Sequence, residues 1–347
     1  MKKNMLVLLL TLLCVLCLSA GAQAEALTSG DYSYELLEDG TAVITKYLTD
    51  GPEDLVIPDS LDGHPVTAIG KRAFRSCWEV LNITVPEGVT SIGNSAFDSD
   101  WHLISITLPS TLTEIGENPF HDCGELTSFI LPPDHPVLSV IDGALFDREG
   151  TRLISYPQGR PGTDYAVPAG TLEIADYAFY ENDVLTGVTL PEGLRTIGKG
   201  AFSFCTELLE IALPDSLESL GENAFGSCLK LQSVTLPDGL TEIGKKVFTE
   251  CYDLVGPSLP ASLKVIGDHA FYFGSALDSL TVPEGVEIID QSAFAWSGLK
   301  TLTLPASVTQ IADNAFNYCD DLVITVQPGS YAEQYCREKE IQFAYAE

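Results

Sequence analysis

Apolar and polar residues alternate along this chain in a unit that repeats about every 23 residues. In the unit at 231–253, Val234 and Leu236 alternate with Ser233 and Thr235. This period of two is typical of a β-strand with one buried face. The pattern predicts one short strand at the start of each unit.

The rest of the unit contains turn residues and a second apolar stretch. Pro237 ends the first strand because proline has no N–H for a sheet ladder. A turn with positive φ is expected at Gly239, a second extended stretch at 240–243, and another turn at Gly244. Phe248 then places an aromatic ring in the interior.

This phenylalanine marks the repeat along almost the whole chain. It stands at positions 74, 97, 120, 179, 202, 225, 248, 271, 294 and 316, and seven of the nine gaps are 23 residues. A fixed period of this length is typical of a solenoid, in which each coil buries its apolar face against its neighbours. The sequence therefore predicts a mainly β solenoid of about ten coils with parallel strands.

Two departures from the period predict local irregularities. Between Pro132 and Pro168 the spacing rises to 36 residues, and the apolar pattern of the added segment predicts a β-hairpin insert at 133–167. Pro257 takes a position where other units have an inward Val or Ile, so a kink or bulge is expected there.

The ends of the described pattern differ from the repeat, as solenoid ends must if the terminal core is to be covered. We expect an N-terminal capping hairpin at 25–52, the solenoid at 53–326, and a C-terminal cap at 327–347. In that cap, Ser330 and Glu333 have the spacing of a capping box that starts a short helix.

Residues 1–24 have the composition of a secretory signal peptide. Two lysines precede an apolar run from Met5 to Leu18, and Ala22-Gln23-Ala24 follows as a small-x-small cleavage site. We therefore expect cleavage near Ala24 and a secreted or cell-surface-associated protein without a membrane-spanning segment.

Acidic residues far outnumber basic ones. The chain has 49 Asp and Glu against 18 Lys and Arg, a net charge of −31 that becomes −33 without the two leader lysines. This charge excludes nucleic acid as a partner, because affinity for phosphate backbones comes chiefly from Lys and Arg. No Asp-x-Asp-x-Asp-Gly loop is present to support a dedicated calcium site.

The consensus Ile-x-Leu-Pro-x-x-Leu/Val-x-x-Ile-Gly-x-x-Ala-Phe-x-x-Cys resembles the BspA-like leucine-rich repeat of bacterial surface proteins. Val85-Pro86, Ile92-Gly93 and Ala96-Phe97 show it in one unit, and the resemblance covers nearly the whole chain after the leader. It implies a leucine-rich-repeat solenoid and an exported adhesin or binding protein. The family has no motif that marks a binding residue.

Cysteines recur three residues after the repeat Phe, at positions 77, 123, 205, 228, 251 and 319. We interpret this column as buried thiols that fill a turn. Disulfides between neighbouring coils and a metal site are the alternatives, although seven cysteines outside the leader is an odd number and no Cys-x-x-Cys pair stands among them.

Two columns of side chains are candidates for ligand binding. Phe273, Trp296 and Tyr318 stand two residues after the repeat Phe in three successive units. Aromatic rings at this spacing suit a sugar platform or a protein hot spot, and the alternative is that they only cover the core. A threonine column on the first strand includes Thr189, Thr235, Thr281 and Thr303, and cross-strand packing alone would also explain it.

No motif for catalysis or for a cofactor is present: the chain lacks Gly-x-Ser-x-Gly, His-Glu-x-x-His and a phosphate loop. We therefore expect a non-enzymatic scaffold that binds a protein, in adhesion or recognition, through its concave sheet or the insert. A glycan-binding module that uses the aromatic residues and a structural envelope component are the alternatives.

Overall fold

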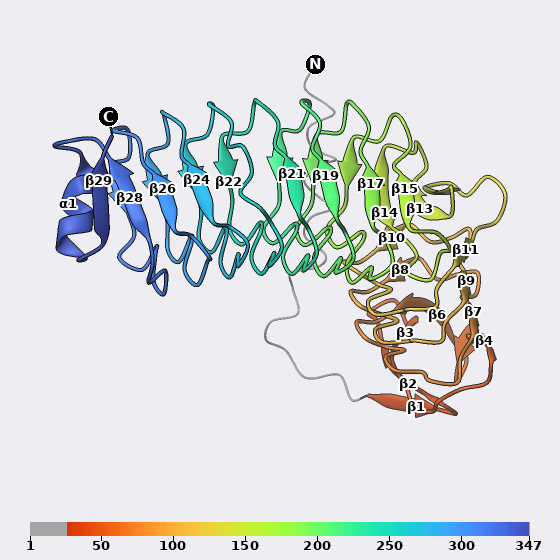
Figure 1. Ribbon diagram of the computed structural model, residues 1–347. Helices are drawn as coiled ribbons and strands as arrows, with labels where there is room; N and C mark the ends of the chain where they lie inside the picture. Colours follow the sequence, from red (N-terminus) through yellow and green to blue (C-terminus); the bar gives the residue numbers. More distant parts are fainter. Residues whose placement is uncertain (1–25, 347) are drawn as a thin grey trace, which may run out of the picture.

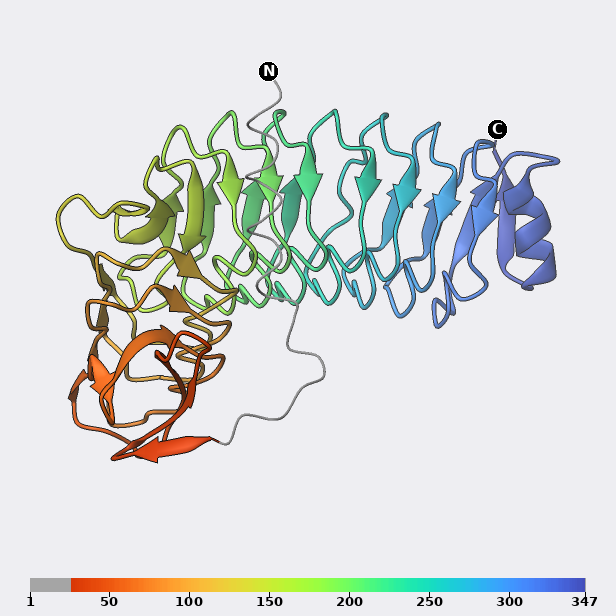
Figure 2. The same ribbon diagram turned by 180° about the vertical axis from the view of Figure 1, so that it is seen from behind.

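The computed structural model describes residues 26–346 and shows a solenoid of about 13 turns with parallel strands. The mainly β solenoid expected from the repeat is confirmed. Figure 1 shows a straight rod that ends at the helix α1, and an N-terminal arm that turns away from the other end of the rod, so that the molecule is L-shaped. Figure 2 shows the same bend from behind.

The first strand of each coil builds one side of the solenoid. These strands form three separate parallel sheets of four strands each. Their members are β4 (Asp54–Val56), β7 (Asn82–Thr84), β9 (Ser105–Thr107) and β11 (Ser128–Ile130); β15 (Asp164–Ala166), β17 (Gly187–Thr189), β19 (Glu210–Ala212) and β21 (Ser233–Thr235); and β24 (Ser279–Thr281), β26 (Thr301–Thr303), β28 (Val323–Val326) and β29 (Gln342–Tyr345).

The second, shorter strand of each coil builds another side. Most of these strands have two residues, because the Ile-Gly step turns the chain at once. They are β6 (His64–Ile69), β8 (Ser91–Ile92) and β10 (Glu114–Ile115); β16 (Glu173–Ile174), β18 (Thr196–Ile197) and β20 (Ser219–Leu220); and β22 (Glu242–Ile243), β23 (Val265–Ile266), β25 (Ile288–Ile289) and β27 (Gln310–Ile311). The two-residue strand β5 (Ser60–Leu61) pairs with β6.

A ladder of stacked aromatic rings runs through the core. Phe225, which is fully buried, lies 5.2 Å from the ring of Phe202 and 5.7 Å from that of Phe248, and the ring planes are within 11° of parallel. Tyr47 and Tyr156 extend the ladder, stacking on Phe74 and Phe179 respectively. The Ala-Phe pattern does not include these two tyrosines, because Lys46 and Ser155 replace the alanine. Tyr156 keeps the 23-residue spacing to Phe179, whereas Tyr47 stands 27 residues before Phe74.

The insert divides the core into two clusters and lies at the bend. It contains β12 (Leu138–Ile141), β13 (Ala144–Asp147) and β14 (Arg152–Ser155). Strand β13 is buried on both faces: Leu145 packs in the N-terminal cluster, whereas Ala144 and Phe146 pack in the C-terminal one. Because the antiparallel hairpin β12–β13 comes between β10 and β14, neither strand series runs through the bend.

Pro257 interrupts the first strand series within the rod, as expected. No strand forms between 254 and 264, and the sheet that ends at β21 is followed by a new sheet at β24. One backbone hydrogen bond, from Val255 N–H to the Gln232 carbonyl at 3.1 Å, remains at this place. The interruption separates threonines that the sequence places in one column.

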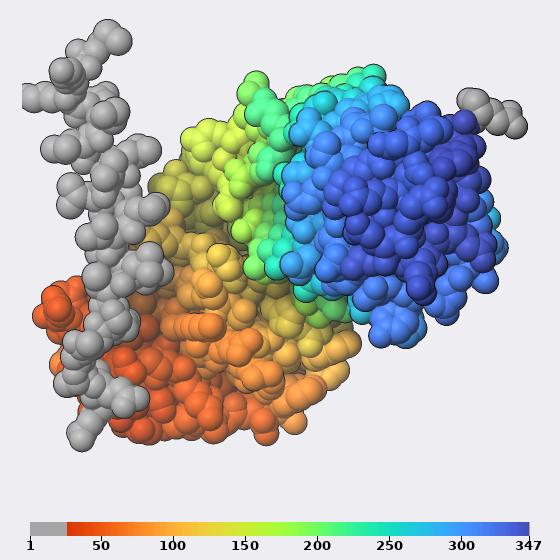
Figure 3. All heavy atoms as spheres, turned by 90° about the vertical axis from the view of Figure 1, so that its left-hand side faces the viewer, coloured from red at the N-terminus to blue at the C-terminus, as the bar shows by residue number. Residues whose placement is uncertain are grey.

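Both ends of the solenoid are covered by different structures. At the N-terminal end, β1 (Leu27–Ser29), β2 (Tyr32–Leu36) and β3 (Ala42–Tyr47) form an antiparallel unit. At the other end, Ser330 caps α1 (Tyr331–Glu338) by accepting a hydrogen bond from Glu333 N–H, which is one half of the expected capping box. The Glu333 carboxylate accepts from Gly329 N–H at 2.7 Å in place of Ser330 N–H. Figure 3, a view along the rod, shows the C-terminal residues closing its near end. No helix of residues 26–346 is long and apolar enough to span a bilayer.

Left-handed backbone flanks the repeat phenylalanine, and sequence reasoning did not foresee it. In each regular coil the residues two before and two after this Phe have positive φ, and most are not glycine; Asn223 and Ser227 around Phe225 have φ of 60° and 58°. The expected positive φ in the Pro-x-Gly turn occurs at Gly193 but not at Gly239. The turn that closes each coil is therefore built mostly from non-glycine residues in the left-handed conformation.

Candidate functional site

The outward face of the last sheet in the first strand series is uncharged. Thr281 on β24 and Thr303 on β26 are register partners and lie side by side. Leu280 and Leu302, the residues before them on each strand, are buried in the core. Two hydroxyl residues that sequence analysis did not select, Thr301 and Thr325, extend this face. Its eight positions are Ser279, Thr281, Thr301, Thr303, Val323, Thr325, Gln342 and Ala344.

Thr189 and Thr235 lie on a different sheet. Thr235 is in register with Ala212 on β19, so a small residue separates the two threonines, and the break at Pro257 separates both from Thr281. The sheet β15–β17–β19–β21 is hollowed on this side by a cavity of about 650 Å³, whose lining includes Asp164 and Glu210. The structure thus brings the four threonines together only in part.

The three candidate aromatic residues form a stack on one edge of the rod. The ring centroids of Phe273 and Trp296 are 5.5 Å apart, and those of Trp296 and Tyr318 are 4.0 Å apart. Trp296 is 45% exposed and Tyr318 is 60% exposed, so both rings are accessible on the surface. Tyr272 packs edge-on against Phe273 at 4.5 Å and enlarges the cluster.

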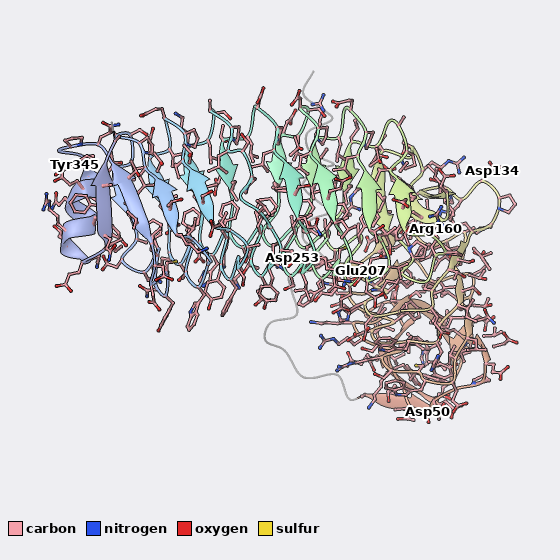
Figure 4. The ribbon with its side chains drawn as sticks, viewed as in Figure 1. Asp50, Asp134, Arg160, Glu207, Asp253 and Tyr345 are labelled. Atoms are coloured by element: carbon pink, nitrogen blue, oxygen red, sulfur yellow. The ribbon has the colours of Figure 1, made fainter. Side chains whose placement is uncertain are left out.

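The bend offers a third concave surface. A cavity of about 490 Å³ lies between the end of β11 and the insert, lined by Ile130, Val140 and Arg148 among others. His135 is buried and holds the connecting loop, because its Nε2–H donates to the Pro109 carbonyl at 2.9 Å while Nδ1 accepts from Leu138 N–H at 3.1 Å. Figure 4 shows Asp134 at the outer corner of the bend.

An ionic contact joins the two arms across the bend. His121 contacts Asp98 at 2.7 Å within the N-terminal arm and Glu181 at 3.3 Å in the first coil of the rod. The hydrogen bond to Glu181, opposed by burial and assisted by Asp98, raises the pKa of His121 to about 9. His121 is therefore charged at neutral pH and holds both carboxylates.

Comparison with protein families identifies the repeat. The pattern of the BspA type leucine rich repeat region (6 copies) matches residues 53–158, 172–297 and 207–323, which together make up more than half of the chain. The chain belongs to the BspA-type leucine-rich-repeat family. Comparison with curated proteins finds no match.

Solved structures share the BspA-type fold of this chain. A leucine-rich repeat protein from Eubacterium ventriosum is similar with a TM-score of 0.55 and 21% identity, covering 81% of this chain and 96% of its own. The pneumococcal vaccine antigen PcpA gives 0.57 and 17%, covering 94% and 100%. A leucine-rich repeat protein from Bacteroides ovatus gives 0.50 and 22%, covering 92% and 100%. At these identities the likeness concerns the fold.

The cysteine of the BspA-type repeat has a defined structural role in this chain. The thiol of Cys228 donates a hydrogen bond to the carbonyl of Phe202 in the preceding coil at 3.1 Å, and Cys251 does the same to Phe225 at 3.1 Å. Burial raises the pKa of the Cys228 thiol, so the sulfur keeps its proton and remains a donor. The column thus gives a second hydrogen bond, from the next coil, to carbonyl groups that already accept one from the backbone of their own turn, as Phe202 does from Cys205 N–H at 3.1 Å.

Asp100 takes the cysteine position in one BspA-type coil. It is fully buried; its Oδ1 accepts a hydrogen bond from Cys77 N–H at 2.7 Å, and its Oδ2 has no partner among the described residues. Burial, reinforced by the nearby Asp98 carboxylate, raises the pKa of Asp100 to about 8. At neutral pH this side chain is therefore mainly a neutral acid.

We expect Asp100 to contribute stability that is lost as pH rises from about 4 to 8, because the folded protein keeps a proton on Asp100 that the unfolded chain has released. Asp100→Cys should flatten this slope and raise the free energy of unfolding at pH 8 by about 1–2 kcal/mol, since the thiol restores the column and no polar atom stays unpaired. Urea denaturation at several pH values measures both effects.

Asn182 provides the control, because it lies in the same column, is buried and does not titrate. Asn182→Cys should leave the pH slope unchanged. An unchanged slope in Asp100→Cys as well would contradict the assignment of the proton to Asp100.

Proposed function

We propose that the protein is an exported, non-enzymatic scaffold that binds a protein partner through the outward face of the sheet β24–β26–β28–β29. The observation that carries this proposal is the absence of charge from the eight outward positions of that sheet, in a chain with 49 acidic residues. Depletion of charge is the compositional mark of the core of protein interfaces. A surface selected only for solubility would carry its share of carboxylates.

The chemistry of the face suits recognition of another protein. Hydroxyl groups of Thr281, Thr301 and Thr303 can donate and accept hydrogen bonds, and the methyl groups beside them contribute apolar area. The face is also rigid, because the central residue of each strand, Leu280 on β24 and Leu302 on β26, is buried in the core. A preordered surface loses little entropy on binding.

Export and a place at the cell surface are part of the proposal. The signal peptide expected at 1–24 lies outside the described residues. Support comes from the fold, which this chain shares with a protein described as a pneumococcal vaccine antigen.

The experiment compares two matched pairs of substitutions. Thr281→Lys with Thr303→Lys places two charges in the centre of the uncharged face. Thr84→Lys with Thr107→Lys makes the same change at the equivalent positions of β7 and β9 in the N-terminal arm. Purified wild-type protein is first screened on immobilised extracellular-matrix and serum proteins, and in parallel on a glycan array.

We expect a saturable protein hit whose affinity falls at least about tenfold in the first pair, because an unpaired charge at the centre of an interface must be desolvated. The second pair should bind like the wild type. Equal binding by both pairs would place the interface elsewhere on the molecule. Binding to glycans alone, or to no probe, would favour a glycan-binding module or an envelope component respectively.

A further inference from the structure

Five aromatic side chains are packed together along one edge of the rod, away from the sheet face discussed above. Phe273, Trp296 and Tyr318 stack from coil to coil with interplanar angles of 24° and 19°. Tyr272 packs edge-on against Phe273, and His269 packs edge-on against Tyr272 at 4.7 Å. We call these five residues the aromatic edge.

The backbone at the stacked rings does not favour aromatic residues. Phe273, Trp296 and Tyr318 have φ of 61°, 60° and 64°, a left-handed conformation that costs a bulky L-residue about 1–2 kcal/mol. The same position in other coils holds Ser76 or Asp122, which adopt this conformation more readily. The left-handed conformation recurs at this position in every regular coil, and most coils meet it without a ring, so the fold does not require rings here.

The geometry of the stack determines which groups the rings can contact. Each ring of the stack packs face to face against the next one, with centroids 4.0–5.5 Å apart. Sugar rings stack on free aromatic faces, and most of these faces are already in contact with each other. Aromatic and sulfur-containing side chains instead pack favourably against ring edges. The aromatic edge therefore suits a protein partner better than a sugar.

The charge around the aromatic edge restricts the partner further. Glu250 takes the aromatic position in the coil before Phe273, and Asp320 and Asp321 stand two and three residues after Tyr318. Asp253 is exposed in the same coil as Glu250, and Figure 4 shows it along the lower part of the rod. Glu207, also labelled there, is already paired with Lys230 at 2.7 Å. An acidic partner would be repelled, whereas arginine and lysine would pair with these carboxylates.

We propose that the aromatic edge is a second interaction surface, which binds a protein segment that presents an aromatic or aliphatic side chain between arginine or lysine residues. The apolar side chain contacts the ring edges of Trp296 and its neighbours, and the cations contact the carboxylates beside them. This surface is separate from the uncharged sheet face and does not depend on the function proposed for that face.

The test uses Trp296→Asn, because asparagine adopts the left-handed conformation well and the variant should keep its stability. Phe204→Asn is the matched control: Phe204 has φ of 61°, is 40% exposed, occupies the same repeat position and contacts Tyr180 outside the aromatic edge. The probes are three labelled synthetic peptides of equal length, alternating Arg with Phe, Glu with Phe, and Arg with Ser. Binding to the full-length protein is measured by fluorescence anisotropy at two salt concentrations.

We expect the Arg-Phe peptide to bind best, with affinity about tenfold lower for Trp296→Asn and unchanged for Phe204→Asn. Added salt should weaken this binding. Thr281→Lys with Thr303→Lys should leave peptide binding intact, which separates this surface from the sheet face.

Three results would overturn the proposal. Equal binding of the Arg-Phe peptide to the wild type and to Trp296→Asn would show that the aromatic rings do not contact the peptide. Equal binding of the Arg-Ser and Arg-Phe peptides would reduce the contact to charge alone. Binding of cellohexaose or chitohexaose that Trp296→Asn abolishes, without peptide binding, would assign the edge to sugars.

Discussion

Phe225→Ala should lower the free energy of unfolding by about 3–5 kcal/mol, the largest effect that we expect from a single substitution in this chain. Phe225 is fully buried and stacks on both neighbours of the aromatic ladder, Phe202 and Phe248. The substitution leaves a cavity and removes two stacked pairs, each of which contributes about 0.5–1.5 kcal/mol beyond the buried area. Because each coil is stabilised only by its neighbours, the loss should weaken both interfaces of this coil.

Urea denaturation followed by tryptophan fluorescence measures this loss. Trp78 and Trp101 report from the N-terminal arm and Trp296 from the rod, so the signal shows whether the two core clusters unfold together. Phe204→Ala is the control, since this ring is 40% exposed and should cost less than about 1 kcal/mol. Equal losses in the two variants would contradict a ladder that carries the stability of the rod.

Gly221→Ala should destabilise the protein by about 3 kcal/mol, at the upper end of the range for overpacking. A Cβ at this position would lie 2.5 Å from the Gly198 carbonyl carbon and from Lys199 N in the preceding coil. Backbone atoms cannot move aside like the end of a side chain, so two coils would have to separate. Thermal or urea denaturation measures the effect.

Gly239→Ala is the matched control from the next coil. A Cβ at Gly239 has no neighbour within 4 Å, and its φ is not positive. Alanine should therefore be neutral or stabilise the protein by about 0.4–1 kcal/mol, because it restricts the unfolded chain. If Gly221→Ala were also neutral, close approach between neighbouring coils would not be the reason for glycine at this position.

This pair of glycines shows where reasoning from a single repeat reached its limit. We expected turn conformations at both the Pro-x-Gly and the Ile-Gly steps. The structure gives another reason for Gly93, Gly198 and Gly221: a Cβ at each would meet backbone of the preceding coil at less than 3 Å. That distance depends on how neighbouring coils stack, which one repeat unit does not contain.

The structure brings some of the candidate binding residues together and keeps others apart. Phe273, Trp296 and Tyr318 do come together, because a column in a regular repeat becomes a row on the surface. Thr189 and Thr235 do not join Thr281 and Thr303, because the break at Pro257 divides the sheet. Residues outside the consensus, such as Asp100 and His121, could not be selected at all, since their partners lie in other coils.

Local sequence is enough to specify the coil. The alternation at the first strand, the proline that ends it and the buried phenylalanine act within a few residues, and their repetition every 23 residues is enough to specify a parallel solenoid. Four features became visible in the three-dimensional structure alone: the bend, the division into two cores at β13, the face-to-face stacking of the exposed rings and the neutral state of Asp100. The physical reason is that each of these features depends on how one coil is placed against the next, and on the burial that this placement produces.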